Sequence, residues 1–193
     1  MMKRLAFATG LLALTAPLAL AQTSTWVPDR AHSEVDFTIL HMSLANVRGR
    51  FGNIGGKIVL NEADITKSSV QVTIDVNTVD TGVEARDRDL KSSNFFDVAQ
   101  FPTATFNSTS VTKDGANHLT VKGNLTLHGV TKPVVLDVVG PTGPIPGMDH
   151  RPHEGFAAST TINRIDFGVG TKYIPSAIGD NVKLTIDIDM VKQ

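Results

Sequence analysis

Hydrophobic and polar residues alternate along most of the chain after Thr25. The alternation is clearest in four segments, 33–40, 69–79, 118–128 and 181–191, and it recurs more weakly in 57–60, 103–111, 133–139 and 156–163. In the last strong segment, for example, Val182, Leu184 and Ile186 alternate with Lys183 and Thr185. Such a period of two is typical of antiparallel strands with one buried and one solvated face. The pattern therefore predicts an all-β protein with eight strands.

Eight antiparallel strands, each with one apolar face, form either a closed barrel or a two-sheet sandwich. Closure of a barrel leaves no unpaired strand edge. The interior of an eight-stranded barrel is either filled by side chains or holds one small ligand. The alternation itself is the same in all these cases and leaves the choice open.

Two segments interrupt the strand pattern. Residues 82–91 are rich in helix formers, and Thr81 followed by Glu84 predicts a capping box at the start of one short helix. The segment 140–155 contains four prolines and four glycines, and we expect it to be an irregular loop.

The first residues of the chain predict a secretory signal peptide. Lys3 and Arg4 precede an apolar stretch, residues 5–20, and small residues end it at Ala21. The stretch is shorter than the roughly 20 residues of a bilayer span and contains Pro17, which argues against a membrane anchor. We therefore expect cleavage near Ala21, a single mature domain over residues 22–193, and a periplasmic or secreted location.

Charge and cysteine content narrow the class of function. Without Lys3 and Arg4, 16 basic side chains stand against 19 acidic ones, a net charge of −3 with no basic cluster. Such a surface is not expected to bind nucleic acid. The chain contains no cysteine, which excludes disulfides and also thiolate chemistry or thiolate zinc ligation.

Motifs of catalysis and metal binding are not found. The sequence has no nucleophile elbow, no H-E-x-x-H helix, no phosphate-binding loop and no dinucleotide fingerprint. His150 and His153 are three residues apart but lie in the Pro-rich segment, and no third ligand is evident nearby. We expect neither an enzyme nor a metal site nor a tightly held cofactor.

Five sequence words, in order, carry a resemblance to a known family: 26-WVPDRAHSEVDFTILHM-42, 47-VRGRFGNIGGKIVL-60, 86-RDRDLKSSNFFDVAQFPTATFNST-109, 123-GNLTLHGVTKPVVLDV-138 and 162-INRIDFG-168. The chain resembles the YceI-like family, the lipid- or polyisoprenoid-binding proteins of bacterial periplasms. The resemblance implies an eight-stranded, lipocalin-like antiparallel barrel with one short helix. It further implies an apolar tunnel that sequesters or carries one lipophilic small molecule, such as a polyisoprenoid, an isoprenoid quinone or a fatty amide.

The resemblance is compatible with a homodimer and implies no membrane span. Two other functions remain open at this point. One is a stress-related structural or interaction protein with a filled barrel, and the other is a small-molecule enzyme on the same scaffold. The second would need a buried His or carboxylate cluster inside the tunnel.

Four of the nine phenylalanines fall within residues 95–106, directly after the predicted helix. Because small residues accompany Phe106 on its face of the strand, we expect these rings to line a tunnel, with plugging of the barrel as the alternative. The predicted wall residues are Phe37, Ile39, Phe95, Phe96, Phe106, Leu125, Leu127 and Ile162. Candidates for contact with a polar head group are His32, Arg86 and Arg164, although His32 also suits a structural hydrogen bond and the arginines a solvated surface.

Overall fold

The structure, a computed structural model, describes residues 23–193. The predicted signal peptide, residues 1–21, lies outside the described residues. Ten strands make up most of the described chain: β1 Thr23–Pro28, β2 Glu34–His41, β3 Ala45–Phe51, β4 Ile54–Asn61, β5 Ser69–Asp75, β6 Thr103–Lys113, β7 His118–Leu127, β8 Val130–Pro146, β9 Pro152–Asn163 and β10 Ile178–Lys192. One α-helix, α1 Glu84–Lys91, and three 3₁₀ turns, η1 Ile65–Lys67, η2 Val76–Thr78 and η3 Arg164–Phe167, complete the described elements.

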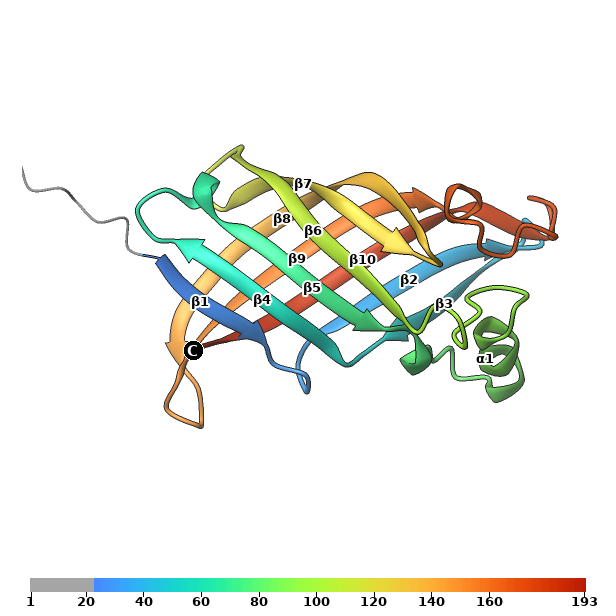
Figure 1. Ribbon diagram of the computed structural model, residues 1–193, viewed down its shortest axis with the longest axis horizontal. Helices are drawn as coiled ribbons and strands as arrows, with labels where there is room; N and C mark the ends of the chain where they lie inside the picture. The colour runs from blue at the N-terminus through green and yellow to red at the C-terminus, as the bar shows by residue number, and fades with distance from the viewer. Residues whose placement is uncertain (1–22) are drawn as a thin grey trace, which may run out of the picture.

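The strands form one antiparallel sheet that closes on itself (Figure 1). The order is β1-β4-β5-β6-β7-β8-β9-β10, and pairing of β1 with β10 closes the ring. The hairpin of β2 and β3 extends it, because β10 pairs with β1 over residues 190–192 and with β2 over residues 178–187. The predicted eight-stranded antiparallel barrel is therefore confirmed, with β1 and β2 lying end to end along β10.

The two strands that sequence alternation missed are short or locally polar. β1 has only six residues, and the outward face of β3 carries Arg48 and Arg50 while Gly49 breaks its apolar face. Gly49 is required there, since a Cβ atom would lie 2.4 Å from the ring of Phe37. The partner strand β2, with Val35 and Phe37 facing inward, supplies the apolar surface at this position.

The helix is present, but the predicted capping box is wrong. Val83 is the N-cap residue and makes no side-chain cap hydrogen bond. Gly82, at φ 72°, turns the chain so that Thr81 lies outside the helix. The backbone N–H and hydroxyl of Thr81 donate instead to Asp87, and Arg86 Nε donates to the Thr81 hydroxyl. These bonds fix Arg86 close to the start of the helix.

The expectation of an irregular loop over residues 140–155 is also wrong. β8 continues to Pro146 and β9 begins at Pro152, so only residues 147–151 form the turn. β7 pairs with β8 no further than Val139, and one edge of β8 is then unpaired. A strand edge without a partner tolerates proline, which has no N–H to donate. Register shifts on either side of Thr142 accommodate the irregular residues.

The two ends of the barrel are packed differently. At one end Trp26, Ile58, Leu60 and Met190 form a dense cluster, each at most 6% exposed. At the other end lie α1, the tip of the β2–β3 hairpin and the segment between η3 and β10 (Figure 1). No helix within residues 23–193 has the length and apolar character to cross a bilayer.

Candidate functional site

A cavity of about 370 Å³ lies inside the barrel at the end that carries α1. Its wall is almost wholly apolar and is contributed by β2, β10 and the inward faces of β5, β6, β7 and β9, with α1 and the segment after η3 at the mouth. Binding sites for small molecules fall in the range of roughly 300–1,000 Å³. The interior is therefore hollow over this part of its length.

Seven of the eight predicted wall residues line this cavity: Phe37, Ile39, Phe95, Phe96, Leu125, Leu127 and Ile162. They come from three strands, β2, β7 and β9, and from the turn that follows α1. Their inward orientation follows the period of two along each strand.

Phe106, the eighth predicted wall residue, is buried and is not among the residues that line this cavity. Its ring covers Gly123 of β7, where a Cβ atom would be 2.3 Å from the ring. The ring occupies the space that a side chain at position 123 would take. Phe106 thus packs into the core with Val121 and Leu125. The neighbouring Ala104 lines the cavity instead.

Aromatic rings form two groups around the cavity. Phe51 lies between Phe37 and Phe96, with ring centroids 5.5 Å apart in both pairs and an edge-on angle of 78° to Phe96. On another side Phe95 stacks on Tyr173 with centroids 5.1 Å apart. Such contacts stabilise aromatic pairs by about 0.5–1.5 kcal/mol beyond area burial. Phe95 and Phe96, the two rings nearest the helix, therefore shape the mouth and wall.

Several wall residues were not predicted. Val182 and Leu184 of β10 line the cavity, and the strict alternation of that strand already placed both on its inward face. Leu90 also lines it from α1, where its apolar side chain was the only signal. Tyr173 and Ile178 come from an irregular segment and its junction with β10, which no periodicity could locate.

The three head-group candidates occupy different environments. His32 is exposed in the turn between β1 and β2, outside the cavity, and its Nδ1 bonds to Asp29 at 3.0 Å. Arg86 lines the cavity and donates from Nε and Nη2 to the hydroxyl and carbonyl of Thr81. The structure thus brings Arg86, but not His32, to the cavity.

Arg164 also borders the cavity, yet its guanidinium is only 3% exposed. It donates six hydrogen bonds, to the carbonyls of Gly179, Val169, Gly170, Tyr173 and Ile178 and to the carboxylate of Asp180. Its carboxylate partner is Asp180, with Nη2 3.0 Å from Oδ1. All five N–H groups are engaged, so Arg164 organises the segment between η3 and β10 rather than a head group.

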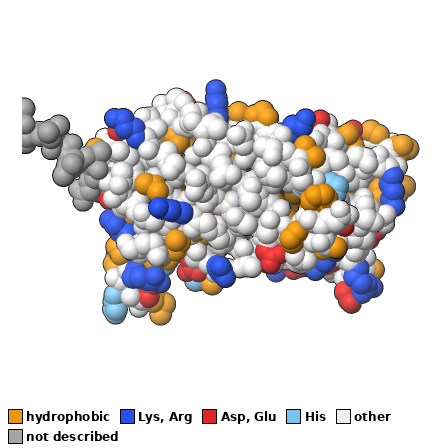
Figure 2. Space-filling view, in the orientation of Figure 1, with side chains coloured by type: hydrophobic (Ala, Val, Ile, Leu, Met, Phe, Trp, Pro, Cys, Tyr) orange, Lys and Arg blue, Asp and Glu red, His pale blue; other side chains and the backbone are white. Residues whose placement is uncertain are grey.

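Exposed apolar side chains surround the mouth. Met42 N–H donates to the carbonyl of Ala177 at 2.8 Å, which joins the tip of the β2–β3 hairpin to the segment before β10. Leu44 and Ile174, exposed by 83% and 65%, lie in these two segments. Figure 2 shows hydrophobic side chains gathered at this end of the molecule.

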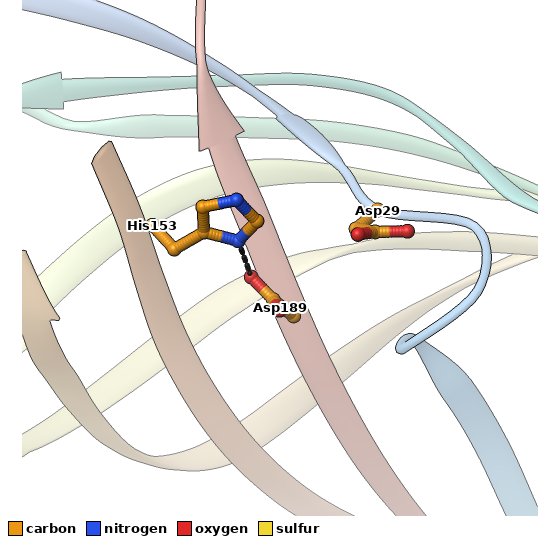
Figure 3. Close-up of side chains that lie close together, drawn as sticks. All are labelled: Asp29, His153 and Asp189. Carbon is orange, nitrogen blue, oxygen red and sulfur yellow. Dashed lines mark hydrogen bonds and ion pairs between the residues drawn. The ribbon is translucent and has the colours of Figure 1, made fainter. Parts of the chain in front are cut away.

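A polar cluster lies outside the barrel and away from the cavity. We call Asp29, His153 and Asp189 the Asp–His cluster; their ligand atoms all lie within 4.8 Å of one another (Figure 3). His153 Nδ1 is 2.8 Å from Asp189 Oδ1, and this contact raises the pKa of His153. The hydrogen bond from His32 lowers the pKa of Asp29. In the sequence His153 lies three residues from His150, whereas the structure places it beside two carboxylates from distant segments.

Comparison with known proteins agrees with this architecture. The model of the YceI-like domain matches residues 26–190. The Protein YceI of Salmonella newport is 38% identical over 191 residues, covering 98% of this chain and 97% of that protein. The crystal structure of Burkholderia cenocepacia BcnA superposes with a TM-score of 0.75 at 25% identity, covering 84% of this chain and 98% of the other. A polyisoprenoid binding domain from Saccharophagus degradans shares the fold at 18% identity, with a TM-score of 0.63 and coverage of 89% and 100%.

Proposed function

The chain belongs to the YceI-like family, and we propose that it binds the apolar tail of one lipophilic molecule, a polyisoprenoid or isoprenoid quinone, inside its barrel. The observation that carries this proposal is the hollow apolar interior at the α1 end. The polyisoprenoid binding named for the Saccharophagus degradans domain supports the same ligand class.

The energetics favour a hydrocarbon chain as the occupant. Transfer of a CH₂ group from water to an apolar site contributes about 0.8 kcal/mol, so a ten-carbon segment contributes about 8 kcal/mol before the costs of binding. The aromatic and branched aliphatic wall offers few partners for a polar molecule. A tail is therefore retained without a specific polar contact deep in the cavity.

The polar end of the ligand stays near the mouth. Arg86 lies in the wall there, with Nε and Nη2 on Thr81, and its guanidinium suits a phosphate or carboxylate. Arg164 has no remaining donor for this role. We assign Arg86 as the head-group residue of the proposed site.

Sequestration requires no reaction. The charged residues of the cavity wall are Arg86, Asp89 and Arg164, with His41 at the mouth. Within the described residues, the Asp–His cluster lies away from this wall. The predicted signal peptide leads us to place this carrier in the periplasm.

Mass spectrometry of an organic extract tests the proposal directly. Protein produced with its leader and purified from the periplasm is expected to release one lipophilic molecule per chain. The purified protein is also offered polyprenols, quinones and fatty amides in solution. A protein that carries no lipid and binds none of these probes contradicts the proposed function.

A bulky side chain introduced into the cavity wall tests whether the lipid binds there. Ala104→Phe places a ring in the wall and is expected to lower lipid uptake about tenfold or more, a loss of about 1.4 kcal/mol. Ala99→Phe adds the same ring at an exposed position and is the control. If Ala104→Phe fails to fold, Val182→Phe narrows the same cavity from β10. Full uptake by a folded cavity variant places the ligand elsewhere.

A further inference from the structure

The Asp–His cluster is held in place by backbone pairing. His153 of β9 is opposite Val191 of β10, and Gly155 is opposite Asp189. His153 and Asp189 therefore lie diagonally on the outer face of neighbouring strands. Asp29, directly after β1, donates its N–H to the carbonyl of Asp189 at 2.7 Å. Three segments that are far apart in the sequence thus meet at one point.

We propose that Asp29, His153 and Asp189 bind a zinc ion on the outer surface of the barrel. Zinc with one nitrogen and two carboxylate ligands at about 2.0–2.2 Å places neighbouring ligand atoms about 3.4 Å apart in a tetrahedron. The cluster spans this value, since His153 Nδ1 and Asp189 Oδ1 are 2.8 Å apart and all three ligand atoms lie within 4.8 Å. Small side-chain adjustments bring the three atoms onto one ion, and water takes the fourth position.

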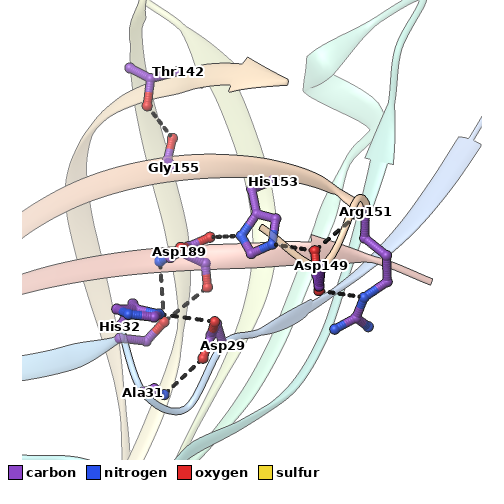
Figure 4. Close-up of polar contacts among 10 residues, drawn as sticks. Asp29, Ala31, His32, Thr142, Asp149, Arg151, His153, Gly155 and Asp189 are labelled. Carbon is purple, nitrogen blue, oxygen red and sulfur yellow. Dashed lines mark hydrogen bonds and ion pairs between the residues drawn. The ribbon is translucent and has the colours of Figure 1, made fainter. Parts of the chain in front are cut away.

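The imidazole is already oriented for this geometry. His153 Nε2 lies 3.4 Å from Asp149 Oδ1, which leaves Nδ1 directed at Asp189 (Figure 4). A carboxylate on the second nitrogen commonly fixes the ring of a metal-binding histidine. Arg151 donates to Asp149 from its backbone N–H and from Nε, and these two hydrogen bonds fix the Asp149 carboxylate beside His153 Nε2.

Charge and ligand type select zinc among common cations. Two carboxylates balance the charge of a divalent ion, so the occupied cluster is neutral. The imidazole nitrogen favours zinc over calcium or magnesium, which prefer sets of oxygen ligands. The side chains of His153 and Asp189 are 16% and 33% exposed, so an ion reaches them from solvent. None of the three ligands lines the cavity, and the site is separate from the proposed lipid site.

Zinc titration of the untagged protein tests this site. Isothermal titration calorimetry is expected to give one zinc ion per chain. Because a ligand that binds only the folded state stabilises it, zinc at about one hundred times its Kd raises Tm by about 5–10 °C. A chelator such as EDTA reverses the shift.

Two histidines of one hairpin give matched variants. His153→Ala is expected to weaken zinc binding about tenfold or more and to remove the Tm shift. His150→Ala, in the exposed turn of the same hairpin, leaves both unchanged. If His153→Ala fails to fold, the unmodified protein is studied by ¹⁵N NMR of its histidine rings. Zinc bound to His153 must remove the proton from Nδ1, which changes the ¹⁵N shift of that nitrogen.

Three results overturn the proposal. They are no heat and no Tm shift with excess zinc, an equal loss in His150→Ala and His153→Ala, and a zinc-induced NMR change confined to other histidines. Lipid content is unaffected in all these variants, so failure here leaves the proposed function untouched.

Discussion

Replacement of Arg164 by lysine tests how the mouth of the barrel is built. The variant keeps the positive charge but changes the number of donors. Arg164 makes six hydrogen bonds with five acceptor carbonyls and one carboxylate oxygen. Lysine offers three donors, so at least three of the six acceptors lose their partner.

The expected destabilisation follows from these bonds. A buried hydrogen bond contributes about 1 kcal/mol net, which gives a loss of about 3 kcal/mol for three acceptors. For a chain of this size, 1 kcal/mol shifts Tm by about 2–4 °C, so we expect a fall of about 6–12 °C. Where solvent reaches the acceptors, the loss of stability is smaller, because water replaces part of the lost hydrogen bonds.

Thermal unfolding followed by circular dichroism measures this fall. Arg88→Lys is the matched control, because Arg88 pairs with Glu84 on the exposed surface of α1, where such a pair contributes at most about 0.5 kcal/mol. Hydrogen exchange adds a local readout, with faster exchange expected for the amides of residues 168–180. A Tm within about 2 °C of the unmodified protein would refute the structural role of Arg164. If Arg164 contacted only the head group of a ligand, the substitution would leave the Tm of the protein unchanged.

The remaining predictions concern single buried positions. Among residues 23–193, one carboxylate oxygen of Glu154 has no hydrogen-bond partner. Desolvation, together with the charge of Glu62, raises the pKa of Glu154, so its charged form destabilises the fold above the ordinary carboxyl pKa of 4.5. Glu154→Gln should therefore raise Tm at neutral pH by about 2 °C or more, with the gain vanishing below that pKa, and a constant gain at all pH values would contradict this account. Gly56→Ala should cost more than about 1 kcal/mol in urea unfolding, since φ is 126° and a Cβ atom would lie 2.2 Å from the Gln71 carbonyl; a neutral effect would show that β4 can shift. Phe106→Trp should lower stability by about 1–3 kcal/mol through overpacking while lipid uptake is retained, and lost uptake in a stable variant would return Phe106 to the wall.

The sequence predicted the parts of the fold that repeat. Alternation over residues 181–191 identified the inward face of β10, since each second residue must leave the solvent, although the strand extends further, from Ile178 to Lys192. The same alternation could not decide between a filled and a hollow barrel, because Phe106 and Phe37 have the same chemistry. What separates them is Gly123, whose missing side chain gives Phe106 a place in the core.

Contacts between distant segments were beyond the sequence. In the sequence, nothing distinguishes Arg164 from a surface arginine. In the structure, the chain turns after η3 so that carbonyls from residues 169–179 accept hydrogen bonds from Arg164. His153 was assigned to a loop with His150, because prolines hid the continuation of β8. Its partners Asp29 and Asp189 depend on how the ring of strands closes, and closure has no local signal.

The dense cluster of Trp26, Ile58, Leu60 and Met190 fills one end of the barrel, and none of these four residues lines the cavity. A barrel that is solid at one end is open to a ligand only from the other, so under the proposed function the filled end limits how many carbons enter and leaves the remainder of a longer chain outside. Cargo length can then be altered by moving the boundary of the filled end, one layer of side chains at a time, while the entrance stays as it is. The solid end meanwhile keeps the strands in register whether or not the tube is loaded.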